Sequence, residues 1–218
     1  MIFPEGTRSA DCSILRFHQG AFHLAEQLGL DILPLMLHGV GHCLPKEETL
    51  LRRGKVYVSI EQRISADNTE FRLGKESLET ARLVRHFYQN RYAEICRQEE
   101  DLDYYKDTVL HNYIYKGAEV ARACKHQLKD CQKLHDLTPE LADTGKMLIK
   151  NCGQGEYALL LALVKKNWHI DAFDEEQDLI DTARHCVAVP ANLHYTTEEI
   201  DETGYDYVID MKREDVKT

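Results

Sequence analysis

Apolar positions spaced three or four residues apart predict three helices in the first two thirds of the chain. They cover about residues 20–28, 75–98 and 118–134. The first is expected to end at Gly29, because glycine readily adopts the left-handed conformation that commonly closes a helix. These helices are compatible with several fold classes, so the strands decide the class.

Alternating and continuous apolar stretches predict the strands. Two are expected early, over residues 31–38 and 55–64. The last third instead alternates strand and helix, with strands at 147–150, 168–173, 191–195 and 205–210 and helices at 155–166 and 177–187. Such alternation is typical of a parallel sheet covered by helices, so the predicted fold class is α/β.

Composition indicates a folded protein with an uneven distribution of charge. The 218 residues are 43% hydrophobic and 29% charged, with a formal net charge of −10, which excludes disordered, collagen-like and coiled-coil classes. Nearly all of the excess negative charge lies in residues 140–218. An acidic surface repels phosphate backbones, so no nucleic-acid partner is expected. We divide the chain into residues 1–73, a helical linker at 74–139, and a last segment at 140–218.

The seven cysteines are an odd number and are widely scattered. No pair has the Cys-x-x-Cys spacing, and no histidine spacing matches a zinc motif. The sequence therefore predicts neither a disulfide framework nor a metal site, and it indicates a reducing, cytoplasmic compartment. The longest apolar run, Tyr157–Val164, is too short to cross a bilayer. The first residues also lack the features of a secretory signal, whereas attachment to a membrane surface stays open.

The segment Glu5-Gly6-Thr7-Arg8 has the chemistry of a phosphate site. Glycine lets a backbone approach a ligand closely, the threonine offers a hydroxyl, and the planar guanidinium of Arg8 is suited to a phosphate. The alternative is an ordinary turn after a strand, with Arg8 in a surface ion pair.

Four stretches in the correct order resemble conserved blocks of the 1-acylglycerol-3-phosphate acyltransferases. They are residues 3–9, 17–25, 32–39 and 53–58, so the similarity covers about residues 1–65. The resemblance implies a mixed α/β sheet bound at the inner, cytoplasmic face of the membrane. It also implies acyl transfer, in phospholipid biosynthesis, from coenzyme A or acyl carrier protein to lysophosphatidic acid, with no further cofactor.

The resemblance also implies roles for individual residues. Glu5, Gly6, Thr7 and Arg8 would bind the acceptor phosphate, and Pro34 would shape the acyl side of the site. Glu5 is expected to orient Arg8 or a hydroxyl rather than to contact the phosphate, because a carboxylate repels a phosphate. His38 could serve as an extra base, but a histidine that follows an apolar strand is more often structural.

The family's catalysis rests on a histidine followed five positions later by an aspartate, upstream of the block found here. This sequence contains one such spacing, His169 and Asp174. It lies out of order in a predicted strand of the acidic segment, and we expect it to be coincidental. The chain is therefore expected to be a carboxy-terminal portion of the acyltransferase domain, to begin at an internal Met1, and to show no acyl transfer by itself.

The last segment resembles the first two motifs of class I S-adenosylmethionine-dependent methyltransferases. A strand at 147–150 runs into a glycine turn and a helix, and the next strand ends at Asp174. The resemblance implies a partial Rossmann-like sheet in which Gly153, Gly155 and Asp174 bind S-adenosylmethionine. Ile149 and Asn151 depart from the family pattern, which usually has an acidic residue and a glycine there.

The middle of the chain, especially residues 113–117, resembles linkers of bacterial proteins that join an acyltransferase to a methyltransferase-like domain. Its tyrosines and its arginines at 82, 85, 91 and 97 could face lipid headgroups, although the acids in the segment favour a solvated helix. Two alternatives to the acyltransferase hypothesis stay open. They are a cofactor-binding methyltransferase-like module and a noncatalytic scaffold.

Overall fold

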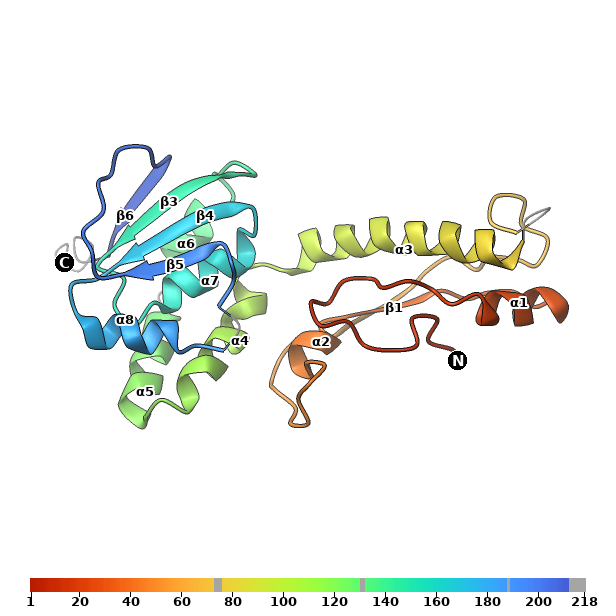
Figure 1. Ribbon diagram of the computed structural model, residues 1–218, viewed down its shortest axis with the longest axis horizontal. Coiled ribbons are helices and arrows are strands. Elements are labelled where there is room, and N and C mark those ends of the chain that lie inside the picture. Colours follow the sequence, from red (N-terminus) through yellow and green to blue (C-terminus); the bar gives the residue numbers. More distant parts are fainter. Residues whose placement is uncertain (73–75, 130–131, 188, 212–218) are drawn as a thin grey trace. The chain divides into compact units, whose positions relative to one another are not determined.

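The computed structural model describes residues 1–72, 76–129, 132–187 and 189–211. They form two compact units, residues 1–100 and 101–218, each with its own sheet and helices (Figure 1). The α/β fold class is confirmed, with both parallel and antiparallel strand pairs. None of the described helices combines the length and hydropathy that a bilayer crossing requires.

In its described residues, 1–72 and 76–100, the first unit combines a two-stranded sheet with three helices. Its elements are α1 (Gly20–Gln27), β1 (Leu35–His38), α2 (Val40–Cys43), β2 (Tyr57–Ile60) and α3 (Ser77–Glu99). Both strands are shorter than expected, and residue 32 forms only an isolated bridge with residue 64. The expected start of the long helix at residue 75, like the expected boundary at residue 73, lies outside the described residues.

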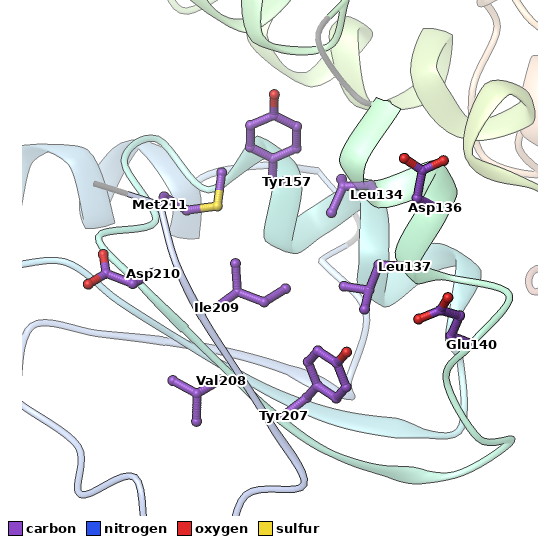
Figure 2. Close-up of a pocket in the computed structure, with 10 residues that line it drawn as sticks. All are labelled: Leu134, Asp136, Leu137, Glu140, Tyr157, Tyr207, Val208, Ile209, Asp210 and Met211. Atoms are coloured by element: carbon purple, nitrogen blue, oxygen red, sulfur yellow. The ribbon is translucent and has the colours of Figure 1, made fainter. Parts of the chain in front are cut away.

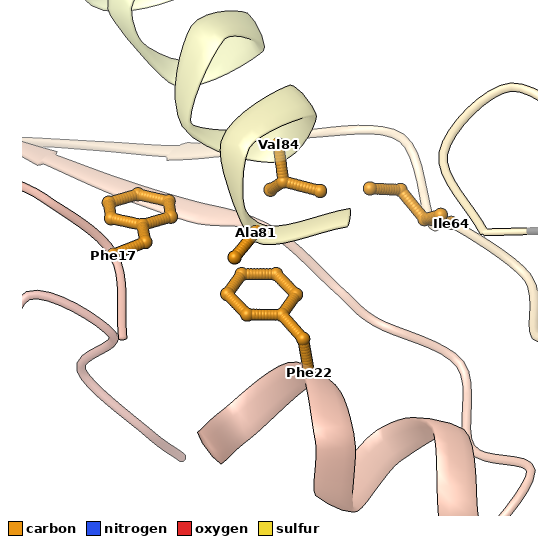
Figure 3. Close-up of a cluster of buried hydrophobic side chains, with 5 residues drawn as sticks. All are labelled: Phe17, Phe22, Ile64, Ala81 and Val84. Atoms are coloured by element: carbon orange, nitrogen blue, oxygen red, sulfur yellow. The ribbon is translucent and has the colours of Figure 1, made fainter. Parts of the chain in front are cut away.

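The core of the first unit joins α1, the strand region and α3. Phe17, Phe22, Ile64, Ala81 and Val84 are all buried and pack together (Figure 3). In the close-up, the two α3 side chains point down toward the phenylalanine rings. This contact explains the helical periodicity of α3, because its apolar positions meet α1 and β1.

The antiparallel pair β1–β2 has an apolar face that lies in solvent. Leu35 pairs with Ile60 and Leu37 pairs with Val58, and alternate residues of a strand share one face. These four side chains are 37% to 68% exposed. The other face buries Met36 and His38, so strand alternation by itself did not indicate which side is covered.

The second unit has a four-stranded parallel sheet in the order β5-β4-β3-β6. Its strands are β3 (Gly145–Lys150), β4 (Trp168–Phe173), β5 (Leu193–Thr196) and β6 (Tyr207–Asp210). Its helices are α4 (Leu102–Ile114), α5 (Ala118–Gln127), α6 (Gln132–Leu137), α7 (Glu156–Val164) and α8 (Gln177–Arg184). The parallel sheet predicted from the strand and helix alternation is confirmed. Helix α7 contacts α4, β4 and β5 and is buried along most of its length.

Two sequence predictions in the helical region are wrong. The single helix expected over residues 118–134 is two helices, because α5 ends at Gln127 and α6 begins at Gln132. Most tyrosines of the stretch before it are buried, so these face neither solvent nor lipid headgroups, whereas the sequence suggested that they could. The stretch forms α4, where Tyr104, Tyr105 and Tyr113 are buried and Asp101 caps the first turn by accepting a hydrogen bond from the Tyr104 N–H.

Candidate functional site

The predicted phosphate segment forms a tight turn on the surface of the first unit. The Gly6 N–H donates to the Phe3 carbonyl over 3.2 Å, and Gly6 has φ of +71°, a conformation in which glycine is unstrained. A Cβ placed on Gly6 would meet the His18 ring at 3.3 Å. The turn thus packs closely against the segment that leads into α1.

Glu5 holds the far side of the same loop. Its Oε2 accepts a hydrogen bond of 2.8 Å from the Leu15 N–H. The Leu15 carbonyl in turn accepts from Arg85 Nε of α3 over 2.7 Å. Glu5 therefore positions the loop through a backbone N–H group, whereas the expectation from the sequence was that it would orient Arg8 or a hydroxyl. The guanidinium of Arg85, which is half-buried, thus donates to backbone carbonyls of the same unit.

Arg8 connects the turn to the loop that follows α2. Its Nη1 donates to the carbonyls of Leu44 and Pro45 over 3.1 and 3.3 Å, and its Nη2 donates to that of Lys46 over 3.0 Å. Among the described residues, Arg8 therefore binds backbone carbonyls and does not form the surface ion pair that was considered as an alternative. Its side chain is exposed, as is that of Thr7.

An apolar cavity of about 590 Å³ lies beside this loop. Residues 1–5 form one wall, and the rest comes from α1, the β1 region and α3. Of the four residues predicted to bind phosphate, Glu5 lines the cavity, and the described lining does not include Gly6, Thr7 or Arg8. Pro34 is buried between Leu33 and Leu35, which both line the cavity.

One tyrosine of the cavity wall has a raised pKa. Tyr88 of α3 lines the cavity, and its hydroxyl donates to the Leu35 carbonyl over 3.4 Å. Burial raises the pKa of Tyr88, and the nearby carboxylates of Glu61 and Glu5 raise it further. The phenol is therefore a neutral hydrogen-bond donor at physiological pH.

His38 is the last residue of β1 and is not among the described residues that line this cavity. The residue is almost fully buried, with 1% of its surface exposed. Its Nδ1 lies 3.2 Å from the Tyr92 hydroxyl, and its Nε2 lies 3.7 Å from Glu100 Oε1. These contacts agree with the structural role that the sequence favoured over that of an extra base.

The glycine turn of the second unit connects β3 to α7. Asn151, Gly153 and Gly155 have φ of +54°, +59° and +80°. The Gly153 N–H donates to Asp174 Oδ2 over 2.9 Å, and the Glu176 N–H donates to Oδ1 over 3.1 Å. The structure thus brings all three residues of the predicted cofactor site together, with Asp174 only 4% exposed.

Glu156, the first residue of α7, is a functional candidate that sequence reasoning missed. It is 1% exposed, and its Oε2 has no hydrogen-bond partner among the described residues. Burial raises the pKa of Glu156 to about 7. In the same turn, burial raises the pKa of Cys152 to about 12, so its thiol is protonated and a poor nucleophile at neutral pH.

A second cavity, of about 440 Å³, lies between α6, α7 and β6. Figure 2 shows Leu134 and Leu137 of α6 facing Ile209, with Tyr207 below them and Asp210 and Met211 on the opposite side. Asp210 accepts a hydrogen bond of 2.7 Å from Asn151 Nδ2. This bond connects the cavity wall to the glycine turn.

His169 and Asp174 do not form a catalytic pair. His169 Nε2 lies 2.9 Å from Asp171 Oδ2 on β4, whereas Asp174 accepts bonds from the glycine turn. Asp171 also accepts a hydrogen bond of 2.7 Å from the Tyr205 hydroxyl. These separate partners agree with the expectation that the spacing of His169 and Asp174 is coincidental.

Comparison with known proteins identifies similarity in the amino-terminal part of the chain. Residues 1–38 match the family model described as Acyltransferase. A 1-acyl-sn-glycerol-3-phosphate acyltransferase of Chlamydomonas reinhardtii is 40% identical over 63 residues, which are 28% of this chain and 19% of that protein. A chloroplastic enzyme of the same name from Arabidopsis thaliana is 38% identical over 69 residues, or 31% of this chain and 19% of that protein.

The similarity extends to a fungal relative. The 1-acyl-sn-glycerol-3-phosphate acyltransferase of Saccharomyces cerevisiae is 35% identical over 77 residues, which are 34% of this chain and 25% of that protein. The chain thus spans about a fifth to a quarter of the length of the curated relatives that it matches. Over that part of its length, and most clearly in residues 1–38, it is similar to the 1-acyl-sn-glycerol-3-phosphate acyltransferases.

Proposed function

We propose that the first unit contributes lipid-acceptor binding to a 1-acylglycerol-3-phosphate acyltransferase of phospholipid biosynthesis. One observation carries this proposal. The segment that matches the acyltransferase family, residues 1–38, supplies much of the wall of the apolar cavity, including the loop before Arg8. The finer fold assignment, a partial acyltransferase sheet, is part of the same proposal.

The cavity has the size and chemistry for an acyl chain. Its volume of about 590 Å³ falls in the usual range of small-molecule sites, about 300 to 1,000 Å³. Each methylene group that enters it would contribute about 0.8 kcal/mol. The lining is mainly aliphatic and aromatic, which favours a hydrocarbon over a sugar or nucleotide.

Arg8 is the proposed partner of the acceptor phosphate. A guanidinium has five N–H donors, and in the part of the chain that the structure describes, no acceptor contacts Nε of Arg8. Nε and one Nη2 hydrogen can therefore bind a phosphate while the loop contacts persist. In this proposal Glu5 and Gly6 shape the turn, and Thr7 offers its exposed hydroxyl.

Binding and turnover are separable in this chain. No histidine in residues 1–100 is followed five positions later by an aspartate. We therefore expect the purified chain to bind lysophosphatidic acid but to transfer no acyl group to it from coenzyme A or acyl carrier protein. Acyl transfer that Arg8→Ala abolishes would contradict this separation.

Displacement of a fluorescent fatty acid by short-chain lysophosphatidic acid tests the binding site. Leu24→Glu places a charge in the cavity wall at a side chain that is 46% exposed. It should weaken the binding of both the fatty acid and lysophosphatidic acid at least tenfold, because the introduced carboxylate must lose its water when a ligand binds next to it. Leu50→Glu is the matched control, since Leu50 is 78% exposed and is not among the described lining residues. Equal effects of the two variants would exclude the cavity as the site.

The second unit supports a second candidate function, binding of S-adenosylmethionine. The supporting observation is the glycine turn at the carboxyl end of β3, next to Asp174 after β4, in a parallel sheet. Ligands of open α/β sheets bind at that edge. A ribose would have to share Asp174 with two backbone N–H groups, which a carboxylate with four lone-pair sites allows.

Calorimetric titration with S-adenosylmethionine tests this candidate. The expected result is micromolar binding that Gly153→Ala weakens at least tenfold, because a methyl group there would obstruct a cofactor but meets no atom within 4 Å in the protein itself. Gly204→Ala, another open position with φ of +94°, should leave binding unchanged. Absence of binding by the unmodified chain would favour the noncatalytic scaffold.

A further inference from the structure

Three side chains with metal-ligating atoms meet where β1 and α3 end. They are His38, Cys96 and Glu100, and with one ligand atom from each, all three atoms lie within 4.8 Å of one another. Cys96 Sγ lies 3.9 Å from His38 Nδ1, and Glu100 Oε1 lies 3.7 Å from His38 Nε2. All three residues belong to the first unit.

The local structure explains why these groups converge. Cys96 and Glu100 are four residues apart, so they share one face at the last turn of α3. The Glu100 N–H closes that turn by donating to the Cys96 carbonyl over 3.0 Å. Packing of α3 against β1 then brings this face to His38.

We propose that His38, Cys96 and Glu100 bind a zinc-class divalent metal ion. Imidazole, thiolate and carboxylate are all established zinc ligands, and three protein ligands leave a fourth position for water. Tetrahedral bonds of the usual lengths place ligand atoms about 3.4 to 3.7 Å apart. The observed separations, up to 4.8 Å, therefore require a contraction of at most about 1.4 Å, which side-chain rotation of Cys96 and Glu100 can provide.

Charge and access fit the same assignment. A thiolate and a carboxylate together balance a divalent cation, in a setting where the side chains of His38 and Glu100 are only 1% and 7% exposed. Cys96 is half-buried, so a path from solvent to the cluster exists. The Tyr92 hydroxyl, 3.2 Å from His38 Nδ1, can hold the imidazole ring in this orientation.

This site departs from the absence of metal that the cysteine and histidine spacing predicted. His38 and Cys96 are 58 residues apart, so no short motif contains both. None of the three is among the described residues lining the apolar cavity, although Tyr92, which contacts His38, does line it.

Titration of the full chain with Co²⁺ and Zn²⁺ tests the site. The expected result is one Co²⁺ per chain with a thiolate-to-cobalt charge-transfer band, displaced by Zn²⁺ but not by Mg²⁺, which prefers oxygen ligands. Cys96→Ser and Glu100→Gln should each weaken Zn²⁺ binding at least tenfold. Cys12→Ser and Glu99→Gln, a half-buried cysteine and the neighbouring half-buried glutamate, are the matched controls.

The proposal would be overturned if Co²⁺ and Zn²⁺ showed no saturable binding, or if the control variants weakened Zn²⁺ binding as much as Cys96→Ser and Glu100→Gln do. The cluster would then be a structural contact between His38 and Glu100. A second measurement covers the case in which Cys96→Ser does not fold. In the unmodified chain, Zn²⁺ should slow alkylation of Cys96 at least tenfold, measured by mass spectrometry, with little effect on Cys12. Equal protection of the two thiols would also overturn the proposal.

Discussion

Arg8 Nη1 donates a hydrogen bond of 3.1 Å to the carbonyl oxygen of Leu44, 36 residues further along the chain. This bond and its two neighbours hold the loop after α2 against the predicted phosphate turn. The same guanidinium that we propose as the partner of an acceptor phosphate therefore also holds the loop after α2 in place.

Substitution of Arg8 should separate these two roles. Arg8→Lys keeps the charge but cannot donate to three carbonyls with a planar fork. We expect it to increase amide hydrogen exchange in residues 44–52 at least fivefold, because each lost hydrogen bond contributes about 1 kcal/mol. Arg8→Ala should do the same and should also weaken lysophosphatidic acid binding more than Arg8→Lys does. Unchanged exchange in both variants would show that the loop contacts have no role in stability.

Glu5 should act on the loop through Leu15. Glu5→Gln replaces a charge-assisted hydrogen bond with a neutral one. We expect the exchange protection of the Leu15 amide to fall about fivefold, equivalent to about 1 kcal/mol. Glu26→Gln, an exposed position on α1, is the control. If both variants leave Leu15 protection unchanged, Glu5 does not position the loop.

Gly155 is crowded as well as left-handed. A Cβ there would lie 2.6 Å from the Tyr195 ring and 2.8 Å from Ala183 Cβ. Gly155→Ala should therefore destabilise the second unit by about 3 kcal/mol, from overpacking together with backbone strain. Gly153→Ala, also at positive φ but open, should cost only about 1 kcal/mol. Urea unfolding followed by the fluorescence of Trp168, the single tryptophan, reports on this unit. If the two variants lost the same free energy of unfolding, backbone strain would account for both losses and the contacts with Tyr195 and Ala183 would add nothing.

Local periodicity predicted most of the second unit because its strands and helices alternate and are buried on a regular pattern. The predicted strand over residues 168–173 has the observed bounds of β4, and the parallel sheet follows from the alternation. The first unit was harder, since β1 and β2 are short and leave an apolar face in solvent. Periodicity reports which residues share a face but not which face is covered.

The candidate sites show the same limit at the level of single side chains. The sequence placed Gly153, Gly155 and Asp174 at adjoining strand ends, and the structure brings them together, because chain topology fixes strand ends. It could not indicate that Arg8 contacts residues 44–46, or that His38 meets Cys96. Such contacts depend on tertiary packing between segments that no local pattern connects.

Glu156 should make the stability of the second unit depend on pH. Its pKa is raised by burial to about 7 in the folded chain, against an ordinary value of 4.5. Between these values the folded state binds more protons than the unfolded state, so stability falls as pH rises from about 4.5 and levels off above about 7. The accumulated loss is on the order of 3 kcal/mol. Glu156→Gln, neutral at every pH, should therefore be more stable than the unmodified chain at pH 8 and similar to it at pH 4.

Urea unfolding at both pH values, followed by Trp168 fluorescence, measures this difference. Glu119→Gln is a suitable control, because Glu119 also lies in the first turn of a helix but is exposed. It should shift the unfolding midpoint little and equally at both pH values. If Glu156→Gln behaves like this control, the carboxyl group of Glu156 ionises as easily in the folded chain as in the unfolded one, and burial at the start of α7 does not hold it neutral.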